Sequence, residues 1–330
     1  MSLAQRILSG DRLALARLVS HIENGDPRGE EALTELYPHT GQAHLVGVTG
    51  GTGTGKSTLV NQLARYLREH GIARGGNAAT PVRVAVVAVD PSSPFSGGAI
   101  LGDRIRMRDL AGDPDVFIRS MATRGAHGGL ARRTRPVVQA LDAAGYEVIL
   151  IETVGAGQSE VEITRSAHTT LVVDAPGLGD EVQAIKAGIL EIADVLVLNK
   201  ADLPGADRAY ATLRTALNLA PDRKREGGGD PEVWRVPLVK TVATEGEGVQ
   251  ELVGHLEQHM VYLEASGERA LRDRERLRAQ LTDLLRDELV EDFLSAQPEG
   301  VFESLVDRVV QRELSPREAV QGLVKPEVEH

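Results

Sequence analysis

The eight residues from Gly50 to Ser57 restrict what this chain can fold into more than any other segment. They read Gly-Gly-Thr-Gly-Thr-Gly-Lys-Ser, which matches the phosphate-binding pattern G-x-x-x-x-G-K-[ST]. A strand-like apolar run at 44–49 precedes them, and a helical run at 57–70 follows. A flexible glycine turn would also join such flanks, but it would not require Lys and Ser in register. The pattern therefore predicts a strand, a loop whose backbone N–H groups surround an anion, and a helix whose N-terminus faces that anion.

Each residue type in this loop suits a nucleoside triphosphate. Glycines let the backbone approach the phosphates, Lys56 reaches the β- and γ-phosphates, and the Ser57 hydroxyl can ligate Mg²⁺. We therefore expect a nucleoside triphosphate to bind here together with Mg²⁺. The predicted phosphate contacts are Gly50, Gly51, Gly53, Gly55, Lys56, Ser57 and Thr58.

The base is indicated by Asn199-Lys200-Ala201-Asp202, which directly follows the apolar run 195–198. In an N-K-x-D loop the aspartate carboxylate can accept hydrogen bonds from the guanine N1–H and exocyclic amine, whereas adenine presents a lone pair to it. Such a mismatch is unfavourable because it leaves polar groups unpaired. A turn that merely closes a strand is the alternative. Because doubly wound sheets bind ligands at the carboxyl ends of their strands, we predict that Asn199, Lys200 and Asp202 contact GTP or GDP.

Three acidic residues are candidates for a magnesium site. Asp90 and Glu152 each end a predicted strand, and Asp103 follows Gly102. Mg²⁺ prefers oxygen ligands and retains several waters, so Ser57, phosphate oxygens and these carboxylates could complete its coordination. Helix capping or turn formation is the alternative for each acid.

The segment from Glu152 to Gly155 stands where GTPases carry a D-x-x-G switch, whose glycine N–H contacts the γ-phosphate. Lys56, Glu152 and Gly155 are the predicted catalytic residues. The sequence shows no evident general base, although Gln158 could position water and several arginines could stabilise charge. The long separation between Lys56 and Glu152 favours a branch of P-loop proteins that has a longer, re-ordered sheet and often works as dimers.

Alternating strand-like and helical runs predict one α/β domain, the P-loop GTPase domain, over residues 44–262. Its strands are near-continuous runs of Val, Ile and Leu, which is typical of a mainly parallel sheet covered by helices on both faces. Helical extensions are expected on each side, over 1–43 and 263–330. The expected strands lie near 44–49, 82–90, 115–120, 147–152, 169–174, 194–199 and 233–240.

The extension 263–330 contains apolar residues that its helices cannot bury alone. Val301, Leu305, Val306 and Val309 recur at helical spacing after Pro298. They could pack on the α/β domain or on a second copy of the chain. A second copy packed on this extension would form a homodimer with two-fold symmetry.

Composition excludes several classes of protein. The 330 residues are 42% apolar and 26% charged, as in ordinary globular proteins. A net charge of −11 disfavours a nucleic-acid partner, and the lack of cysteine excludes disulfides and thiolate-bound metals. No apolar run approaches the roughly 20 residues that span a bilayer. We therefore expect a cytoplasmic protein with no nucleic-acid or membrane partner.

Together these motifs resemble the MeaB/ArgK family of GTPases, whose human counterpart is the methylmalonic aciduria type A protein. The likeness covers about residues 5–265 well and the tail only loosely. The matching segments are Gly47–Gly50, Gly55–Thr58, Asp90–Ser93, Gly97–Asp103, Glu152–Glu160, Gly179–Gly188 and Asn199–Asp202.

The resemblance implies a GTP-dependent chaperone of an adenosylcobalamin-dependent acyl-CoA mutase, such as methylmalonyl-CoA mutase or a close relative. A protein of this family gates cofactor loading, protects the mutase, and hydrolyses GTP slowly until the mutase accelerates it. The resemblance also implies that Asp90, Asp103 and Glu152 surround Mg²⁺. A further switch, Asp180–Gly188, would face the mutase. The resemblance implies as well that the extension 263–330 contributes to a homodimer, which we therefore expect.

The resemblance places Thr241, Val242 and Ala243 in a loop that contacts the base. The family commonly has Thr-Ser-Ala there, and because the contact is made through backbone atoms, we expect guanine binding to survive the change. The family also commonly has proline at the position of Thr52. The rigidity of the phosphate loop can therefore differ in this chain.

Two other functions share part of this pattern. A nickel or cobalt metallochaperone GTPase would need a Cys/His cluster, and this chain has no cysteine and only 9 scattered histidines. A kinase acting on a small molecule or a protein, as the old ArgK label suggests, would need a phospho-acceptor pocket, which the sequence does not reveal. Transfer of the γ-phosphate to water or to an acceptor would separate these functions.

Overall fold

The structure, a computed structural model, describes residues 1–73, 78–90, 108–110, 112–122, 129–153, 167–177, 191–219 and 233–324. The chain forms two compact units, Met1–Arg276 and Leu277–His330, which are described separately. The division predicted at residues 43 and 262 stays a prediction.

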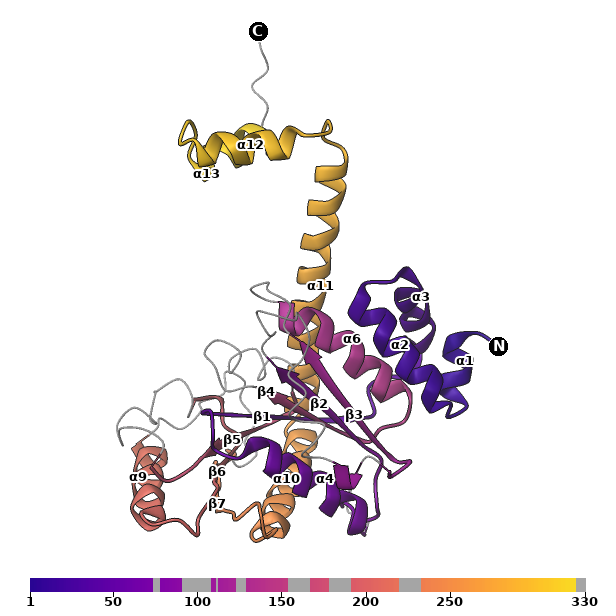
Figure 1. Cartoon of the computed structure of the whole chain (residues 1–330). Coiled ribbons are helices and arrows are strands. Elements are labelled where there is room, and N and C mark those ends of the chain that lie inside the picture. The colour runs from indigo at the N-terminus through magenta and orange to yellow at the C-terminus, as the bar shows by residue number, and fades with distance from the viewer. Residues whose placement is uncertain are drawn as a thin grey trace. The chain divides into compact units, whose positions relative to one another are not determined.

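A seven-stranded sheet, parallel throughout, forms the centre of the first unit (Figure 1). Its spatial order is β3-β2-β4-β1-β5-β6-β7. The α/β fold predicted from the sequence is thereby confirmed, although the last strand is shorter than the predicted 233–240. The strands are β1 (His44–Gly50), β2 (Val84–Asp90), β3 (Val116–Ala122), β4 (Val148–Thr153), β5 (Thr169–Asp174), β6 (Val195–Leu198) and β7 (Leu238–Lys240).

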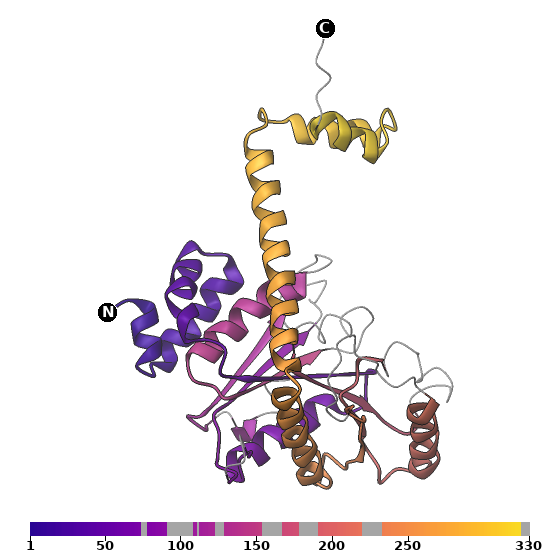
Figure 2. The same ribbon diagram turned by 180° about the vertical axis from the view of Figure 1, so that it is seen from behind.

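Helices cover both faces of this sheet, as the reverse view in Figure 2 also shows. No helix in the described ranges has the length and apolar character needed to cross a membrane. The helices of the first unit are α1 (Leu3–Leu8), α2 (Arg12–Asn24), α3 (Pro27–Leu36), α4 (Lys56–Glu69), α6 (Gly129–Ala143), α9 (Ala206–Leu219) and α10 (Val249–Ala265), with 3₁₀ turns η1 (Tyr37–His39) and η2 (Arg108–Leu110). Helix α11 (Glu268–Ser295) begins in this unit and continues into the second, which also holds α12 (Val301–Val310) and α13 (Pro316–Val324).

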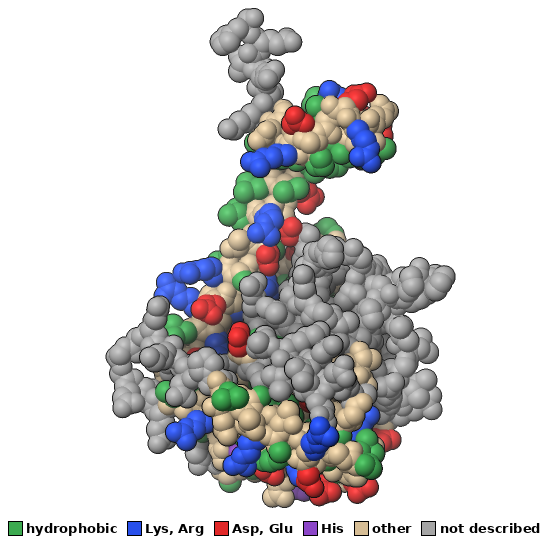
Figure 3. Space-filling model, turned by 90° about the vertical axis from the view of Figure 1, so that its left-hand side faces the viewer, with side chains coloured by type: hydrophobic (Ala, Val, Ile, Leu, Met, Phe, Trp, Pro, Cys, Tyr) green, Lys and Arg blue, Asp and Glu red, His purple; other side chains and the backbone are tan. Residues whose placement is uncertain are grey.

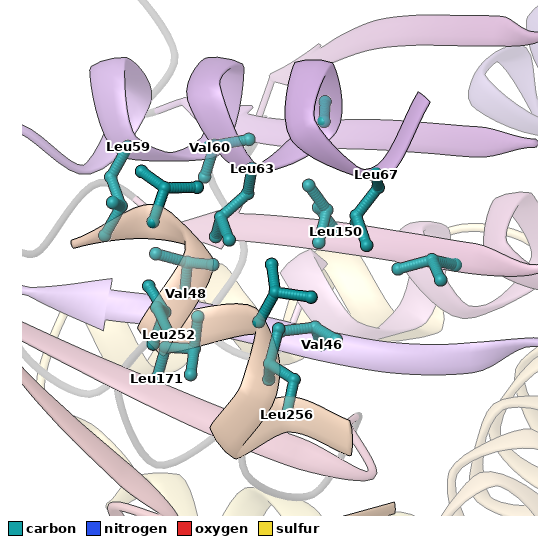
Figure 4. Packing of buried hydrophobic residues seen from close by; sticks show 14 of the residues in the cluster. Val46, Val48, Leu59, Val60, Leu63, Leu67, Leu150, Leu171, Leu252 and Leu256 are labelled. Carbon is teal, nitrogen blue, oxygen red and sulfur yellow. The ribbon is translucent and has the colours of Figure 1, made fainter. Parts of the chain in front are cut away.

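The central strand β1 is buried along its whole length. On one face, Val46 and Val48 pack against Leu59 and Leu63 of α4, with Leu252 of α10 close by (Figure 4). On the other face, the alternate residue Leu45 belongs to a core formed by α2, α3 and α6. A strand buried on both faces needs apolar side chains at successive positions, which explains the near-continuous Val and Leu run.

The N-terminal helices share a core with the sheet. Leu18 of α2 and Leu36 of α3 lie in the same buried cluster as Leu141 of α6 and Ile149 of β4. Asp142 of α6 also accepts hydrogen bonds from the successive backbone N–H groups of residues 41–43, which lead into β1. The start of β1 is thus held by a buried carboxylate as well as by apolar packing.

The first turns of α11, residues 268–276, are fixed at the amino end of the sheet. Arg272 forms a bidentate ion pair with Asp194, at 2.8 and 2.9 Å, and donates to the His168 carbonyl at 2.6 Å. Asp194 is buried just before β6 and also accepts from the Thr170 N–H. A buried charge pair of this kind makes loss of one partner strongly destabilising, because the other charge stays buried.

His168 takes part in the same network as a neutral ring. Its Nδ1 accepts the Leu45 N–H at 3.0 Å, so the proton resides on Nε2, which donates to Asp273 of α11 at 2.9 Å. Protonation of His168 at Nδ1 would replace the acceptor by an N–H group that faces the Leu45 N–H, so that two donors would oppose each other. Burial lowers the pKa of His168, and the Asp273 hydrogen bond opposes that effect only in part.

The pKa of His168 in the folded state lies below its usual value. As the pH falls, the unfolded chain therefore binds a proton at this histidine before the folded chain does. We expect the free energy of unfolding to fall as the pH drops from about 7 towards 5.5, with this site contributing up to about 1.4 kcal/mol per pH unit. Thermal unfolding of His168→Gln should show a shallower pH dependence than that of wild type. The control His255→Gln removes a surface histidine of α10 and should keep the wild-type slope. Equal slopes in wild type and His168→Gln would contradict this assignment.

Candidate functional site

The loop between β1 and α4 lies at the carboxyl edge of the sheet, beside the ends of β4 and β5. The register pairs Val48 with Glu152 of β4 and Gly50 with Val173 of β5. From β1 the chain continues to β2, β3 and β4 on one side of β1, and it then crosses to β5 on the other side. In doubly wound sheets such a position is where ligands bind.

Two glycines of this loop hold conformations that a side chain would not permit. Gly50 has φ of 140°, and a Cβ there would lie 2.0 Å from the Val173 carbonyl oxygen. Gly55 has φ of 90°, and its Cβ would lie 2.4 Å from Nδ2 of Asn199. Both positive φ values and both close approaches require glycine. The pattern of the phosphate loop is therefore also a packing requirement in this chain.

Lys56 begins α4 and lies against the loop that precedes it. Its Nζ donates to the carbonyl oxygens of Gly50 at 2.9 Å and Gly51 at 2.8 Å. Only 6% of the residue is exposed. The positive charge is thus held next to the N-terminus of α4, where the helix dipole also favours an anion.

Asn199, directly after β6, connects the phosphate loop to the loop after β7. Its Nδ2 donates to the Thr54 carbonyl at 2.8 Å. Its Oδ1 accepts from the Thr241 hydroxyl at 3.0 Å and from the Ala243 N–H at 3.1 Å. The side chain is almost fully buried, and it joins three loops. The structure therefore brings together the predicted segments 50–57, 199–202 and 241–243.

The turn after Asn199 presents Asp202 at the surface. Lys200 adopts φ of 56°, and the Ala201 N–H donates to the Thr241 carbonyl at 3.0 Å. Asp202 is exposed. An exposed carboxylate beside a buried Asn is the arrangement that the predicted guanine contact needs.

Ser57 and Glu152, two of the predicted magnesium ligands, contact each other directly. The Ser57 hydroxyl donates to Oε1 of Glu152 at 2.6 Å, a length typical of a hydrogen bond to a carboxylate. Glu152 is 6% exposed at the end of β4. A hydroxyl and a carboxylate oxygen at one point are ligands that suit Mg²⁺.

Other predicted residues lie outside the described part of the chain. These are Asp103, Gly155, Gln158 and the segment Asp180–Gly188, together with the side chain of Asp90, whose backbone ends β2. Within the described ranges, no group of three or more His, Asp or Glu side chains is placed to hold a metal ion.

Sequence reasoning missed three polar residues at this edge. The Thr153 hydroxyl donates to the buried Thr49 hydroxyl at 3.2 Å, which links the ends of β4 and β1. Asp174 ends β5, accepts the Ala175 N–H at 2.8 Å, and has a raised pKa because of burial. In the sequence, Thr49, Thr153 and Asp174 stand out only as polar residues near strand ends. Polar residues at strand ends are also typical of ordinary turns, so this pattern does not indicate a site.

A parallel α/β sheet whose central strand ends in a phosphate loop, tied through Asn199 to an N-K-x-D turn, defines a P-loop GTPase. The model of the family described as methylmalonyl Co-A mutase-associated GTPase MeaB matches residues 15–298. The chain belongs to this family. It is a GTPase, and the family implies guanine-nucleotide binding.

Several known proteins are similar over most of the chain. A protein named as a GTPase in Pyrococcus abyssi is 44% identical over 98% of this chain and 95% of its own length. The mitochondrial methylmalonic aciduria type A homolog of Mus musculus is 35% identical over 97% of this chain and 77% of its own length. Among solved structures, that of an LAO/AO transport system kinase has a TM-score of 0.69 and 26% identity, covering 98% of this chain and 95% of the other.

The exposed position of Asp202 yields a prediction about base selection. Asp202→Asn should weaken GTP binding by roughly 10- to 100-fold, because a hydrogen bond to a charged group is lost. It should improve binding of xanthosine triphosphate, whose C2 carbonyl replaces the guanine amine. Calorimetric titration measures both affinities. Asp207→Asn, at an exposed position of α9, is the control and should leave both affinities unchanged. An unchanged GTP affinity in Asp202→Asn would show that Asp202 does not contact the base.

Proposed function

We propose that this protein is a GTP-dependent chaperone of an adenosylcobalamin-dependent acyl-CoA mutase, gating cofactor loading and protecting the mutase. The observation that carries the proposal is the match of the MeaB family description, which names methylmalonyl-CoA mutase, to residues 15–298. The name of the mouse relative, which refers to methylmalonic aciduria, supports the same substrate class. Asn199 bonds to the phosphate loop through the Thr54 carbonyl. This contact would keep the proposed guanine-binding turn close to the phosphates.

The proposed nucleotide site uses the residues predicted from the sequence. The phosphate loop Gly50–Ser57 would bind the phosphates, with Lys56 at the β- and γ-phosphates. Asn199 would hold the loop 241–243 in place, and Asp202 would accept hydrogen bonds from the guanine. For Mg²⁺ we propose Ser57, Glu152, Asp90 and Asp103; the ion would neutralise phosphate charge. The direct Ser57–Glu152 contact supports this set for two of its four members.

Slow hydrolysis in the absence of a partner is part of the proposal. Among the described residues, the buried histidines are His44, His168 and His259, and their hydrogen bonds place them in the network at the amino ends of β1 and β5. None of these three borders the phosphate loop, so they offer no general base there. A mutase that orders a switch segment or supplies an arginine would raise the rate, as partners do in other GTPases.

The switch proposal concerns Gln183 and Lys186, which lie outside the described residues. Gln183→Ala and Lys186→Ala should keep GTP affinity and the basal rate of hydrolysis but lose most of the mutase-stimulated rate. They would weaken the coupling between the mutase and GTP hydrolysis and leave the nucleotide contacts intact. Phosphate release is measured with and without the cognate mutase. Full stimulation of both variants, or an equal loss of basal and stimulated rates, would reject the switch. Fast turnover by the protein alone would reject partner-dependent hydrolysis.

The same assay separates this function from a kinase. The name of the similar LAO/AO transport system kinase structure suggests phosphate transfer to another molecule. With γ-labelled GTP, our proposal expects all the label in inorganic phosphate, with or without mutase. Label that appears on a protein or an amino acid would favour the kinase.

We further propose that the second unit mediates a homodimer. Its surface carries hydrophobic side chains among charged ones (Figure 3). Of the predicted stripe, Val301, Leu305 and Val309 are half-buried and Val306 is exposed. An apolar surface of this kind marks an interaction site, and a self-complementary one gives a two-fold dimer. The other exposed apolar residues of the unit are Leu281, Leu284, Leu285, Leu289, Val290, Phe302, Val310, Val320 and Val324.

Substitutions on α12 test the homodimer in the full chain. Light scattering should give wild type a two-chain mass, whereas a Phe302→Glu/Val306→Glu variant should shift towards one chain, because charge is introduced into the proposed interface. Ser304→Glu, exposed on the same helix, is the control and should remain a dimer. A one-chain wild type would reject the homodimer, and a two-chain double variant would remove this face of α12 from the interface.

A further inference from the structure

Thr54 differs from its neighbours in the phosphate loop because it is buried. Residues 51–53 are exposed, whereas only 1% of Thr54 is exposed. Its hydroxyl donates to the Gly51 carbonyl at 3.0 Å, and its own carbonyl accepts from Nδ2 of Asn199 at 2.8 Å. Thr54 thus bonds to the first half of the phosphate loop through its side chain, and to Asn199 of the N-K-x-D turn through its backbone carbonyl.

The Gly51 carbonyl has two other donors, the Nζ of Lys56 at 2.8 Å and, at the longer distance of 3.5 Å, the Thr54 N–H. A loop that binds phosphates must direct N–H groups at them and turn carbonyl oxygens away, since a carbonyl oxygen and a phosphate repel each other. If Lys56 moves its amine to the β- and γ-phosphates, the Gly51 carbonyl loses that donor. Of the two donors that then remain, the Thr54 hydroxyl at 3.0 Å is closer to the Gly51 carbonyl than the Thr54 N–H.

We propose that Thr54 is a positioning residue for GTP, whose hydroxyl keeps the Gly51 carbonyl turned away from the phosphates when Lys56 binds them. The inference rests on the proposed assignment of Gly50–Ser57 to the phosphates. Glycine-rich backbone has many accessible conformations, and a side-chain bond across the loop reduces their number before the nucleotide binds.

Two variants separate the hydroxyl from the shape of the side chain. Thr54→Val keeps the shape and removes the donor, and Thr54→Ser keeps the donor and removes the methyl group. Loss of one hydrogen bond of this kind corresponds to roughly a 2- to 12-fold change in affinity. We therefore expect Thr54→Val to weaken GTP and GDP by about that factor and Thr54→Ser to stay close to wild type.

Kinetics and stability distinguish positioning from a purely structural role. If the hydroxyl positions the loop equally in the bound and transition states, KM for GTP should rise in Thr54→Val while kcat stays near the wild-type value. A purely structural role would lower Tm without changing nucleotide affinity. The matched control is Thr215→Val, which removes a threonine hydroxyl that donates to the Ala211 carbonyl of α9 at 2.8 Å; it should change neither KM nor affinity.

The experiment is calorimetric titration of the full-length proteins with GDP and GTP, followed by steady-state GTP hydrolysis. Wild-type affinity in Thr54→Val would overturn the inference. Affinity in Thr54→Ser as weak as in Thr54→Val would also overturn it, because the effect would then belong to the methyl group. A wild-type protein that binds neither nucleotide would instead reject the assignment of the phosphate loop.

Discussion

The parallel direction of all seven strands is the constraint on which the rest of this structure depends. Parallel strands place their carboxyl ends together at one edge of the sheet and their amino ends at the other. Segments that are about a hundred residues apart in sequence, such as Ser57 and Glu152, thereby become neighbours. Burial of β1 on both faces by α4, α10, α2 and α6 then fixes the position of the loop that leaves it.

The two edges of the sheet differ in chemistry. The carboxyl edge combines glycines with Lys56, whose amine bonds to the loop carbonyls, and with a surface carboxylate, Asp202. At the amino edge, the polar groups of Asp194, His168 and Arg272 bond to one another. The first edge is suited to binding and the second to fixing α11. Buried polar groups that are fully bonded in this way rigidify a structure.

Motifs whose residues are close in sequence could be predicted, because their geometry is local. The Gly50–Ser57 pattern implies the loop and α4, and the Val-rich run at 84–89 implies a strand covered on both faces. Pairings that depend on strand order could not be predicted. The Arg272–Asp194 pair joins residues 78 apart in sequence, and nothing in either local sequence names its partner. The predicted strand over 233–240 was too long, since only Leu238–Lys240 pair with β6.

The candidate site was predictable in its residue types and less so in its contacts. Asn199 was predicted to contact GTP or GDP, and the contacts of its amide with the phosphate loop and with Thr241 and Ala243 were not foreseen. An amide offers both a donor and an acceptor, so it can bridge a carbonyl on one loop and an N–H on another, which a carboxylate could not do. In the proposed nucleotide site, one buried side chain thus connects the phosphate loop to the loop 241–243. A movement of either loop must stretch the hydrogen bonds of Asn199, so the positions of the two loops are physically linked.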